Sequence, residues 1–118
     1  MARILVVDDD QAILDATKLL LEYEGYEVLT ASDGDTVRKI ETDLPDLILL
    51  DIWLSGTDGA EIARFLKQQE YSRRIPIILF SANRNIEELA EKAGVEDSLV
   101  KPFDWMDLLQ KVQKYIAD

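Results

Sequence analysis

The segment Asp46-Leu47-Ile48-Leu49-Leu50-Asp51 is the most informative part of the sequence about the fold, because four consecutive apolar residues lie between two aspartates. A short, continuous apolar run with polar ends is typical of a strand that is buried on both faces of a parallel sheet. A second run of this kind, Arg3-Ile4-Leu5-Val6-Val7-Asp8, also ends at a carboxylate. Both runs predict buried parallel strands with aspartates at their carboxyl ends.

Segments with helical spacing of apolar residues separate the strand-like runs. We expect a first helix that includes Ile13 and Leu21, with Asp9 or Asp10 as its cap and Gly25 as its end. Further strands are expected at 27–31, 75–80 and 98–100, and further helices at 35–42, around 62–66, at 86–93 and at 105–116. The prediction is five strands and five helices in strict alternation.

Strict alternation of strands and helices implies a three-layer α/β sandwich, because right-handed crossovers place helices on both faces of a parallel sheet. Two sheet orders satisfy this pattern. In both, the ligand site lies beyond the carboxyl ends of the strands, where the winding reverses. The chain has 118 residues, 47% of them hydrophobic, which is enough for one core. We therefore expect residues 1–118 to form one domain.

Charge and missing residue types exclude several classes of function. Asp and Glu number 24 against 13 Lys and Arg, and the net charge of −11 disfavours nucleic-acid and membrane partners. The sequence has no His and no Cys, so neither imidazole nor thiolate chemistry is available. No apolar run is long enough to span a bilayer, and no signal-peptide pattern follows Met1. We expect a cytoplasmic protein.

The predicted strand ends bring polar side chains from distant parts of the sequence to one rim of the sheet. They are Asp8, Asp9, Asp51, Ser81 and Lys101. Carboxylates held close together raise one another's pKa unless a cation neutralises them. An all-oxygen site with open positions suits Mg²⁺, or Mn²⁺ in its place. A metal, a lysine and a hydroxyl around one exposed aspartate predict phosphorylation of Asp51.

Five stretches in register resemble the receiver domain of bacterial two-component response regulators, and the resemblance covers the whole chain. They are Ile4-Leu5-Val6-Val7-Asp8-Asp9-Asp10, Asp46-Leu47-Ile48-Leu49-Leu50-Asp51-Ile52, Gly56-Thr57-Asp58-Gly59, Pro76-Ile77-Ile78-Leu79-Phe80-Ser81-Ala82 and Val100-Lys101-Pro102-Phe103. The resemblance implies a flavodoxin-like fold with sheet order 2-1-3-4-5. It also implies a signalling domain, not an enzyme with a separate substrate, that catalyses its own aspartyl phosphorylation and dephosphorylation.

The resemblance implies partners and roles for the residues that act on the phosphoryl group. The donor is a phosphohistidine on a sensor histidine kinase or on a histidine phosphotransfer protein. Asp51 is the implied acceptor, Ser81 hydrogen-bonds a phosphoryl oxygen, and Lys101 pairs with the phosphoryl group. The peptide between Lys101 and Pro102 is expected to be cis. A downstream protein is expected to bind the face formed by the fourth helix, the fifth strand and the fifth helix.

The implied metal ligands are Asp8, Asp9, Asp51 and the backbone carbonyl of Trp53, with Asp9 binding directly and Asp8 more often through water. Trp53 and Asn83 also occupy the two positions that tune the lifetime of the aspartyl phosphate in the family. Trp53 is bulky and apolar, and we expect it to shield the phosphoryl group from water.

Two positions depart from the family pattern. Most receivers carry an aromatic residue three positions before the lysine, whereas this chain has Ser98. We therefore expect the signal to leave through movement of the loop at 81–85, with less help from a ring. Ser55 replaces a common proline, and we expect a modest loosening there.

Other interpretations remain open. Asp8-x-Asp10 superficially resembles the haloacid-dehalogenase phosphatase motif, although that family has Thr or Val where Ala12 stands. A pseudo-receiver that binds partners without phosphorylation is a second alternative, although such modules usually lose the acidic pair, the acceptor or the lysine. A flavodoxin-type cofactor protein is disfavoured, since its first loop would cradle a phosphate and here carries three aspartates. Asp8 and Asp9 could also serve only as helix caps.

Overall fold

Five parallel strands form the central sheet of the computed structural model, which describes residues 1–38, 40, 44–54 and 56–116. The strands are β1 (Arg3–Val7), β2 (Glu27–Ala31), β3 (Leu47–Asp51), β6 (Ile77–Ser81) and β7 (Asp97–Val100). They lie in the order β2-β1-β3-β6-β7. Numbered among themselves, this is the order 2-1-3-4-5, so the predicted flavodoxin-like sheet is confirmed.

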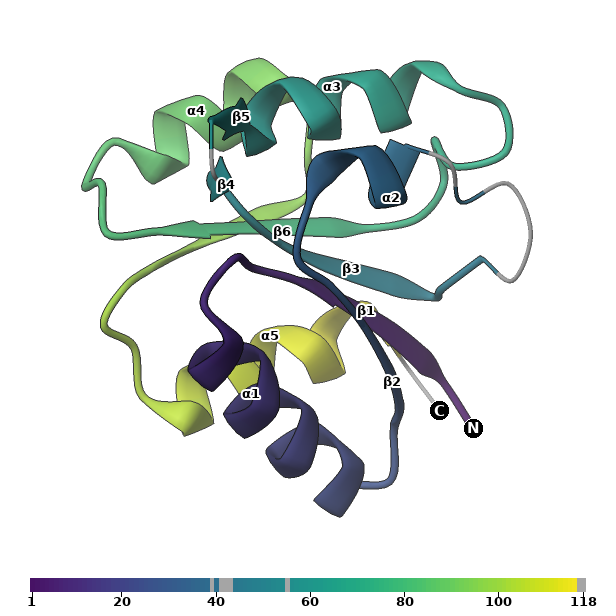
Figure 1. Cartoon of the computed structure of the whole chain (residues 1–118), viewed down its shortest axis with the longest axis vertical. Helices are drawn as coiled ribbons and strands as arrows, with labels where there is room; N and C mark the ends of the chain where they lie inside the picture. Colours follow the sequence, from purple (N-terminus) through teal and green to yellow (C-terminus); the bar gives the residue numbers. More distant parts are fainter. Residues whose placement is uncertain (39, 41–43, 55, 117–118) are drawn as a thin grey trace.

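Helices cover both faces of this sheet. The described residues contain α1 (Gln11–Tyr23), α2 (Gly34–Arg38), α3 (Gly59–Gln68), α4 (Ile86–Ala93) and α5 (Trp105–Tyr115). Figure 1 shows α1 and α5 on one face and α2, α3 and α4 on the other. The predicted three-layer α/β arrangement with five helices is thereby confirmed. None of the helices in the described part of the chain combines the length and apolar character needed to cross a membrane.

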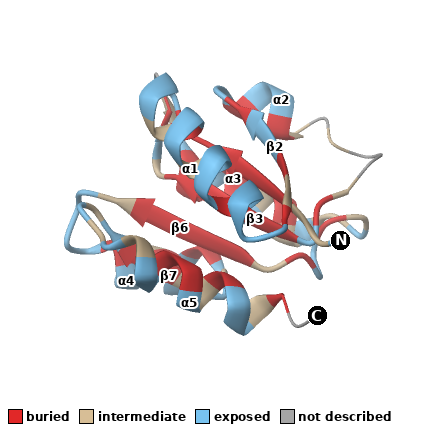
Figure 2. Cartoon of the chain, turned by 90° about the horizontal axis from the view of Figure 1, so that it is seen from below, coloured by how far each residue is buried: buried red, intermediate tan, exposed pale blue. Residues whose placement is uncertain are grey.

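Two hydrophobic cores lie on opposite faces of the sheet, which explains the continuous apolar runs of the strands. Leu47 and Leu49 of β3 pack toward the side of α1 and α5, in the same cluster as Leu14 and Val112. Ile48 and Leu50 belong to the opposite cluster, with residues from α3 and α4. Every residue of β3 is buried, as the red strands of Figure 2 show. Apolar side chains can fill both faces without leaving buried polar groups that lack hydrogen bonds.

The structure corrects several predicted boundaries. β6 begins at Ile77, two residues later than expected, and α1 ends at Tyr23 with Glu24 as its cap. The second helix starts at Gly34, and part of its predicted extent to 42 lies outside the described residues, as does Ser55. Asp10 caps α1, because its side chain accepts hydrogen bonds from the next turn. Asp8 and Asp9 are therefore not the caps.

A short hairpin after β3 was not predicted. It consists of β4 (Trp53–Leu54) and β5 (Thr57–Asp58), which pair antiparallel, with Gly56 at a φ of 87° between them. Strands of two residues have no apolar periodicity, so the sequence carries no pattern for them. The hairpin leads directly into α3, whose first turn is capped by Asp58.

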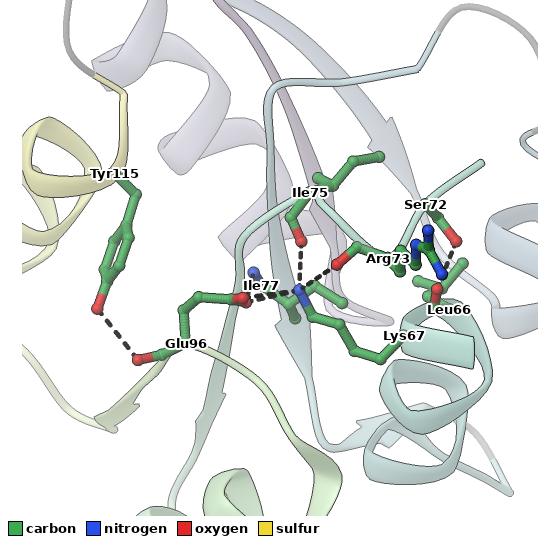
Figure 3. Close-up of polar contacts among 8 residues, drawn as sticks. All are labelled: Leu66, Lys67, Ser72, Arg73, Ile75, Ile77, Glu96 and Tyr115. Carbon is green, nitrogen blue, oxygen red and sulfur yellow. Dashed lines mark hydrogen bonds and ion pairs between the residues drawn. The ribbon is translucent and has the colours of Figure 1, made fainter. Parts of the chain in front are cut away.

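Polar contacts tie together the opposite edge of the sheet, where β6 and β7 begin. Lys67 of α3 donates to the carbonyl of Ile75 over 2.7 Å and lies 2.8 Å from the carboxylate of Glu96 (Figure 3). Glu96 also accepts from the amide of Ile77 over 2.9 Å, and its backbone carbonyl accepts from the Tyr115 hydroxyl. The α3, β6, β7 and α5 elements are thus linked away from the carboxyl edge.

Candidate functional site

Three carboxylates meet at the carboxyl edge of the sheet. Asp8 directly follows β1 and Asp51 ends β3, and these two strands are hydrogen-bonded neighbours. Asp8, Asp9 and Asp51 each offer one carboxylate oxygen, and the three oxygens lie within 4.8 Å of one another. Asp8 is 1% exposed and Asp51 only 7%, whereas Asp9 is exposed. We expected the acceptor aspartate to be exposed, and this was wrong. Asp51 is buried, because both faces of β3 are covered.

Lys101 brings a positive charge to this acidic cluster from the end of β7. Its ammonium lies 2.9 Å from a carboxylate oxygen of Asp8 and 3.7 Å from one of Asp51. It also lies 4.8 Å from the centre of the Phe80 ring. The peptide between Lys101 and Pro102 is cis, as expected. The lysine is thus held among two carboxylates and an aromatic face, with Asp8 as its nearest ionic partner.

The surroundings of Asp51 oppose its negative charge. Burial is the largest cause that raises the pKa of Asp51 to about 6, and the charge of Asp8 adds to it. Lys101 and the backbone amide of Trp53 lower this pKa, but they do not compensate for the other two effects. A buried carboxylate beside another carboxylate is stabilised by additional positive charge. This electrostatic imbalance is what a bound cation would relieve.

The donor set fits a hard divalent cation. Carboxylate and carbonyl oxygens are the ligands that Mg²⁺ prefers, and the described residues around the cluster offer no nitrogen or sulfur ligand. Asp8 already accepts hydrogen bonds from Lys101 and from the Asp10 amide. Both contacts on Asp8 leave fewer of its lone pairs for a metal.

Ser81 lies at the end of β6, in the strand next to β3. Its hydroxyl oxygen accepts a hydrogen bond from the backbone amide of Asn83 over 3.1 Å, and its carbonyl accepts from the amide of Lys101. The side chain of Asn83 accepts from the Asn85 amide, which keeps it in the loop. The hydroxyl hydrogen of Ser81 remains available as a donor, because the oxygen serves as acceptor in the loop contact.

Trp53 follows Asp51 by two residues and is 64% exposed. Its strand β4 pairs with β5, whose Asp58 precedes α3. No role was predicted for Gly59, the first residue of α3, although it ends the stretch Gly56-Thr57-Asp58-Gly59. A Cβ atom at Gly59 would lie 2.1 Å from the carbonyl oxygen of Asp51 and 2.8 Å from the Cα of Ile52. The absence of a side chain therefore allows α3 to begin against the acceptor's own backbone.

Two pockets flank the predicted functional residues. One of about 340 Å³ is lined by Ile13, Ala82 and the segment from Lys101 to Phe103, beside the acidic cluster. The other, of about 240 Å³, lies between α4 and β7 and includes Ser98. Ser98 is buried within β7, where its amide donates to the Asp97 carboxylate and its carbonyl accepts from Lys111. The structure thus brings together the residues of the rim and leaves Ser98 on a separate surface.

Known proteins share this arrangement. Residues 4–113 match the family described as response regulator receiver domain. The chain is 41% identical over 118 residues to the CAI-1 autoinducer sensor kinase/phosphatase CqsS of Vibrio cholerae, covering 97% of this chain and 17% of CqsS. The curated relatives that it matches are covered over 17% to 51% of their own length. The chain is therefore similar to only one part of each of these relatives.

Solved structures resemble the chain over nearly its whole length. One is the receiver domain of sensor histidine kinase PA1611 from Pseudomonas aeruginosa, which has a magnesium ion coordinated in its active site cleft. It is 34% identical with a TM-score of 0.88, over 99% of this chain and 98% of that one. Another is the response regulator TrrA from Thermotoga maritima in complex with Mg²⁺-BeF. It is 35% identical with a TM-score of 0.87, over 98% of this chain and all (100%) of that one.

Proposed function

The chain belongs to the response regulator receiver domain family of two-component signalling, and from this premise we propose that Asp51 accepts a phosphoryl group from a phosphohistidine. The observation that carries the proposal is the meeting of Asp8, Asp9, Asp51 and Lys101 at one edge of the sheet. The donor is a sensor histidine kinase or a histidine phosphotransfer protein. Residues 1–118 act as one receiver unit in the cytoplasm, without nucleic-acid or membrane partners.

The residues of the site perform an in-line phosphoryl transfer. A carboxylate oxygen of Asp51 attacks phosphorus while the bond from phosphorus to the donor imidazole nitrogen breaks, and the electron pair of that bond stays on the nitrogen. Lys101 pairs with a phosphoryl oxygen, and the Ser81 hydroxyl donates a hydrogen bond to another. Preorganised positive charge and donors of this kind stabilise the transferring group more than they stabilise the free acceptor.

Asp8, Asp9, Asp51 and the Trp53 backbone carbonyl would hold Mg²⁺, or Mn²⁺ in its place, and the cation would neutralise the carboxylates and the phosphoryl oxygens. Two observations support this assignment: the close approach of the three carboxylates, and the raised pKa of Asp51. The role of Asp8 includes holding Lys101, because the two side chains lie 2.9 Å apart. Release of Lys101 from Asp8 toward the new phosphoryl group accompanies the reaction.

The phosphorylated domain then presents a changed surface to a downstream protein. Ser81 begins the loop to α4, and Asn83 is bonded to its hydroxyl, so movement of Ser81 toward the phosphoryl group moves this loop. The surface of α4, β7 and α5 adjoins the loop and is the proposed output face. The domain catalyses its own phosphorylation and dephosphorylation and has no other substrate.

The proposal is tested by the intact mass of the protein after incubation with acetyl phosphate. We expect one phosphoryl adduct with Mg²⁺ and none after chelation, because the carboxylates otherwise repel the phosphoryl group. Asp51→Asn removes the nucleophile and abolishes the adduct. Asp46→Asn is the matched control, since Asp46 precedes the same strand at the opposite edge. A wild-type chain that binds Mg²⁺ but forms no adduct with either acetyl phosphate or a phosphohistidine protein would instead indicate a pseudo-receiver.

Trp53→Ala is expected to shorten the lifetime of the aspartyl phosphate. The exposed indole follows the acceptor by two residues, and its removal opens the path of water to phosphorus. An increase of about fivefold in the hydrolysis rate corresponds to a barrier lowered by about 1 kcal/mol. The decay of the adduct is followed by mass after the donor is removed. Tyr23→Ala, which removes an exposed ring from α1, is the control, and equal decay rates in all three proteins would contradict the shielding role.

A further inference from the structure

A small acidic pocket lies between α4 and the edge strand β7, on the proposed output face. Its volume is about 240 Å³, which is below the range of typical small-molecule sites. Figure 2 shows α4, β7 and α5 side by side at this end of the molecule. Ala90 and Ser98 are buried residues that line it, while Glu87 and Glu91 of α4 line it from the exposed side. The pocket is therefore of the size of a single side chain and has a polar, negatively charged wall.

Two of the acidic residues that line the pocket are already neutralised. Lys67 lies 2.8 Å from the carboxylate of Glu96 (Figure 3), and Lys111 lies 2.7 Å from that of Asp97. Burial opposes the charge of Asp97, but hydrogen bonds led by that from Lys111 outweigh it and keep the pKa of Asp97 below its ordinary value. These two carboxylates need no further cation.

Glu87 and Glu91 differ from them, because neither has a cationic partner among the residues that the structure describes. They are four residues apart on α4, so their side chains are neighbours on one face of the helix. Like charges at this spacing repel each other. Glu88, on the adjacent face, is by contrast paired with Lys92 over 3.3 Å. Of the four carboxylates that line the pocket, those of Glu96 and Asp97 are paired with lysines, and those of Glu87 and Glu91 are not.

The hydroxyl of Ser98 is an independent sign of a missing ligand. Ser98 is only 8% exposed, and its backbone amide and carbonyl are bonded to Asp97 and Lys111. Its hydroxyl has no hydrogen-bond partner in the described part of the chain, and it keeps some contact with solvent. Ser98 lines the pocket, so a ligand in the pocket would lie next to this residue. A nearly enclosed hydroxyl without a protein partner can gain a hydrogen bond from such a ligand.

We propose that this pocket receives an arginine side chain of the downstream protein, with Glu87 and Glu91 binding the guanidinium and Ser98 accepting at the end of the pocket. Arginine fits better than lysine, because a guanidinium has five donors in a planar fork and can bond several acceptors at once. An aromatic residue at position 98 would fill this space, whereas serine leaves it open. The identification of the partner as the output protein rests on the proposed function, but the chemistry of the pocket does not.

The probe for this proposal is N-acetyl-L-arginine amide, added to the isotope-labelled protein while backbone amide shifts are recorded. We expect saturable shifts at Ala90, Glu91 and Ser98. N-acetyl-L-citrulline amide has nearly the same shape without the charge, and we expect it to bind at least about fivefold more weakly. Equal affinities for the two probes, or shifts spread over the whole acidic surface, would overturn the proposal.

Variants distinguish arginine binding in the pocket from nonspecific attraction of arginine to an acidic protein. The double variant E87Q/E91Q is expected to weaken arginine binding by about fivefold or more. The control E22Q/E24Q removes two charges at the C-terminal end of α1 and its cap, and is expected to leave arginine binding unchanged. Ser98→Phe fills the pocket and is expected to abolish binding, with a thermal melt to verify folding. Concentration-dependent dimers that only E87Q/E91Q abolishes would show that a second copy supplies the arginine, and would refute a separate partner.

The same samples are tested with acetyl phosphate and with a phosphohistidine protein, so that the two proposals fail separately. Arginine binding without a phosphoryl adduct from either donor would refute the proposed function and support the pocket. An adduct at Asp51 without arginine binding would refute the pocket and support the proposed function.

Discussion

Asp51→Asn is expected to raise the melting temperature of the metal-free protein at about pH 7, by about 5 °C or more. Asp51 is 7% exposed, and burial and the charge of Asp8 raise its pKa to about 6. In the unfolded chain the pKa of this carboxyl is near its ordinary value of 3.8. The ionised side chain therefore costs the folded state on the order of 1–3 kcal/mol at neutral pH. Asparagine keeps the shape and removes this cost.

The effect has a defined pH window. Between about pH 4 and 6 the folded protein holds a proton on Asp51 that the unfolded chain has lost, so stability falls as pH rises through this range. Below about pH 4 both states are protonated. The advantage of Asp51→Asn over the wild type should therefore disappear there and reach its full size above about pH 6.

Two controls test whether the higher melting temperature of Asp51→Asn arises from the acidic cluster. Asp46→Asn makes the same chemical change at an exposed carboxylate before β3, and its melting temperature should remain near that of the wild type. Mg²⁺ should stabilise the wild type more than Asp51→Asn, because the variant lacks one ligand of the proposed site. A metal-free Asp51→Asn protein that melts below the wild type at neutral pH would show that Lys101 already compensates the charge of Asp51.

Gly59→Ala is expected to destabilise the protein by about 3 kcal/mol, which lowers the melting temperature by about 10 °C. The new Cβ would lie 2.1 Å from the carbonyl oxygen of Asp51 and 2.8 Å from the Cα of Ile52. Both contacts are with backbone, which cannot move aside like the end of a side chain. The start of α3 or the end of β3 must therefore shift, and with it the acceptor carboxylate. We also expect slower adduct formation from acetyl phosphate.

Gly→Ala inside an ordinary helix stabilises the helix by up to about 1 kcal/mol. A loss of stability at Gly59 would therefore report its close contact with the backbone of Asp51. Gly25→Ala is the matched control. Gly25 has a φ of 96° and no atoms within 4 Å of the added Cβ, so only backbone strain of about 1–2 kcal/mol is expected. If Gly59→Ala were as stable as the wild type by thermal and denaturant unfolding, the close approach of α3 to Asp51 would not constrain the site.

The location of the acidic cluster was predictable, but its internal contacts were not. Asp8 and Asp51 each follow a buried apolar run, and neighbouring parallel strands place their carboxyl ends at one edge. That Lys101 lies nearer to Asp8 than to Asp51 depends on the path of the loop after β7, which has no local pattern. The raised pKa of Asp51 likewise depends on how far the surrounding chains bury it.

The amino-acid sequence alone predicted the order of strands and helices along the chain, the two-sided burial of the sheet and the rim where polar residues collect. These properties follow from periodicity along the chain, since side-chain direction repeats regularly in strands and helices. Three features appear only in the folded chain: the β4–β5 hairpin, the approach of Gly59 to Asp51 and the open pocket at Ser98. Each of these depends on distances between segments that are far apart in sequence or lack periodicity, and packing of the whole chain sets those distances.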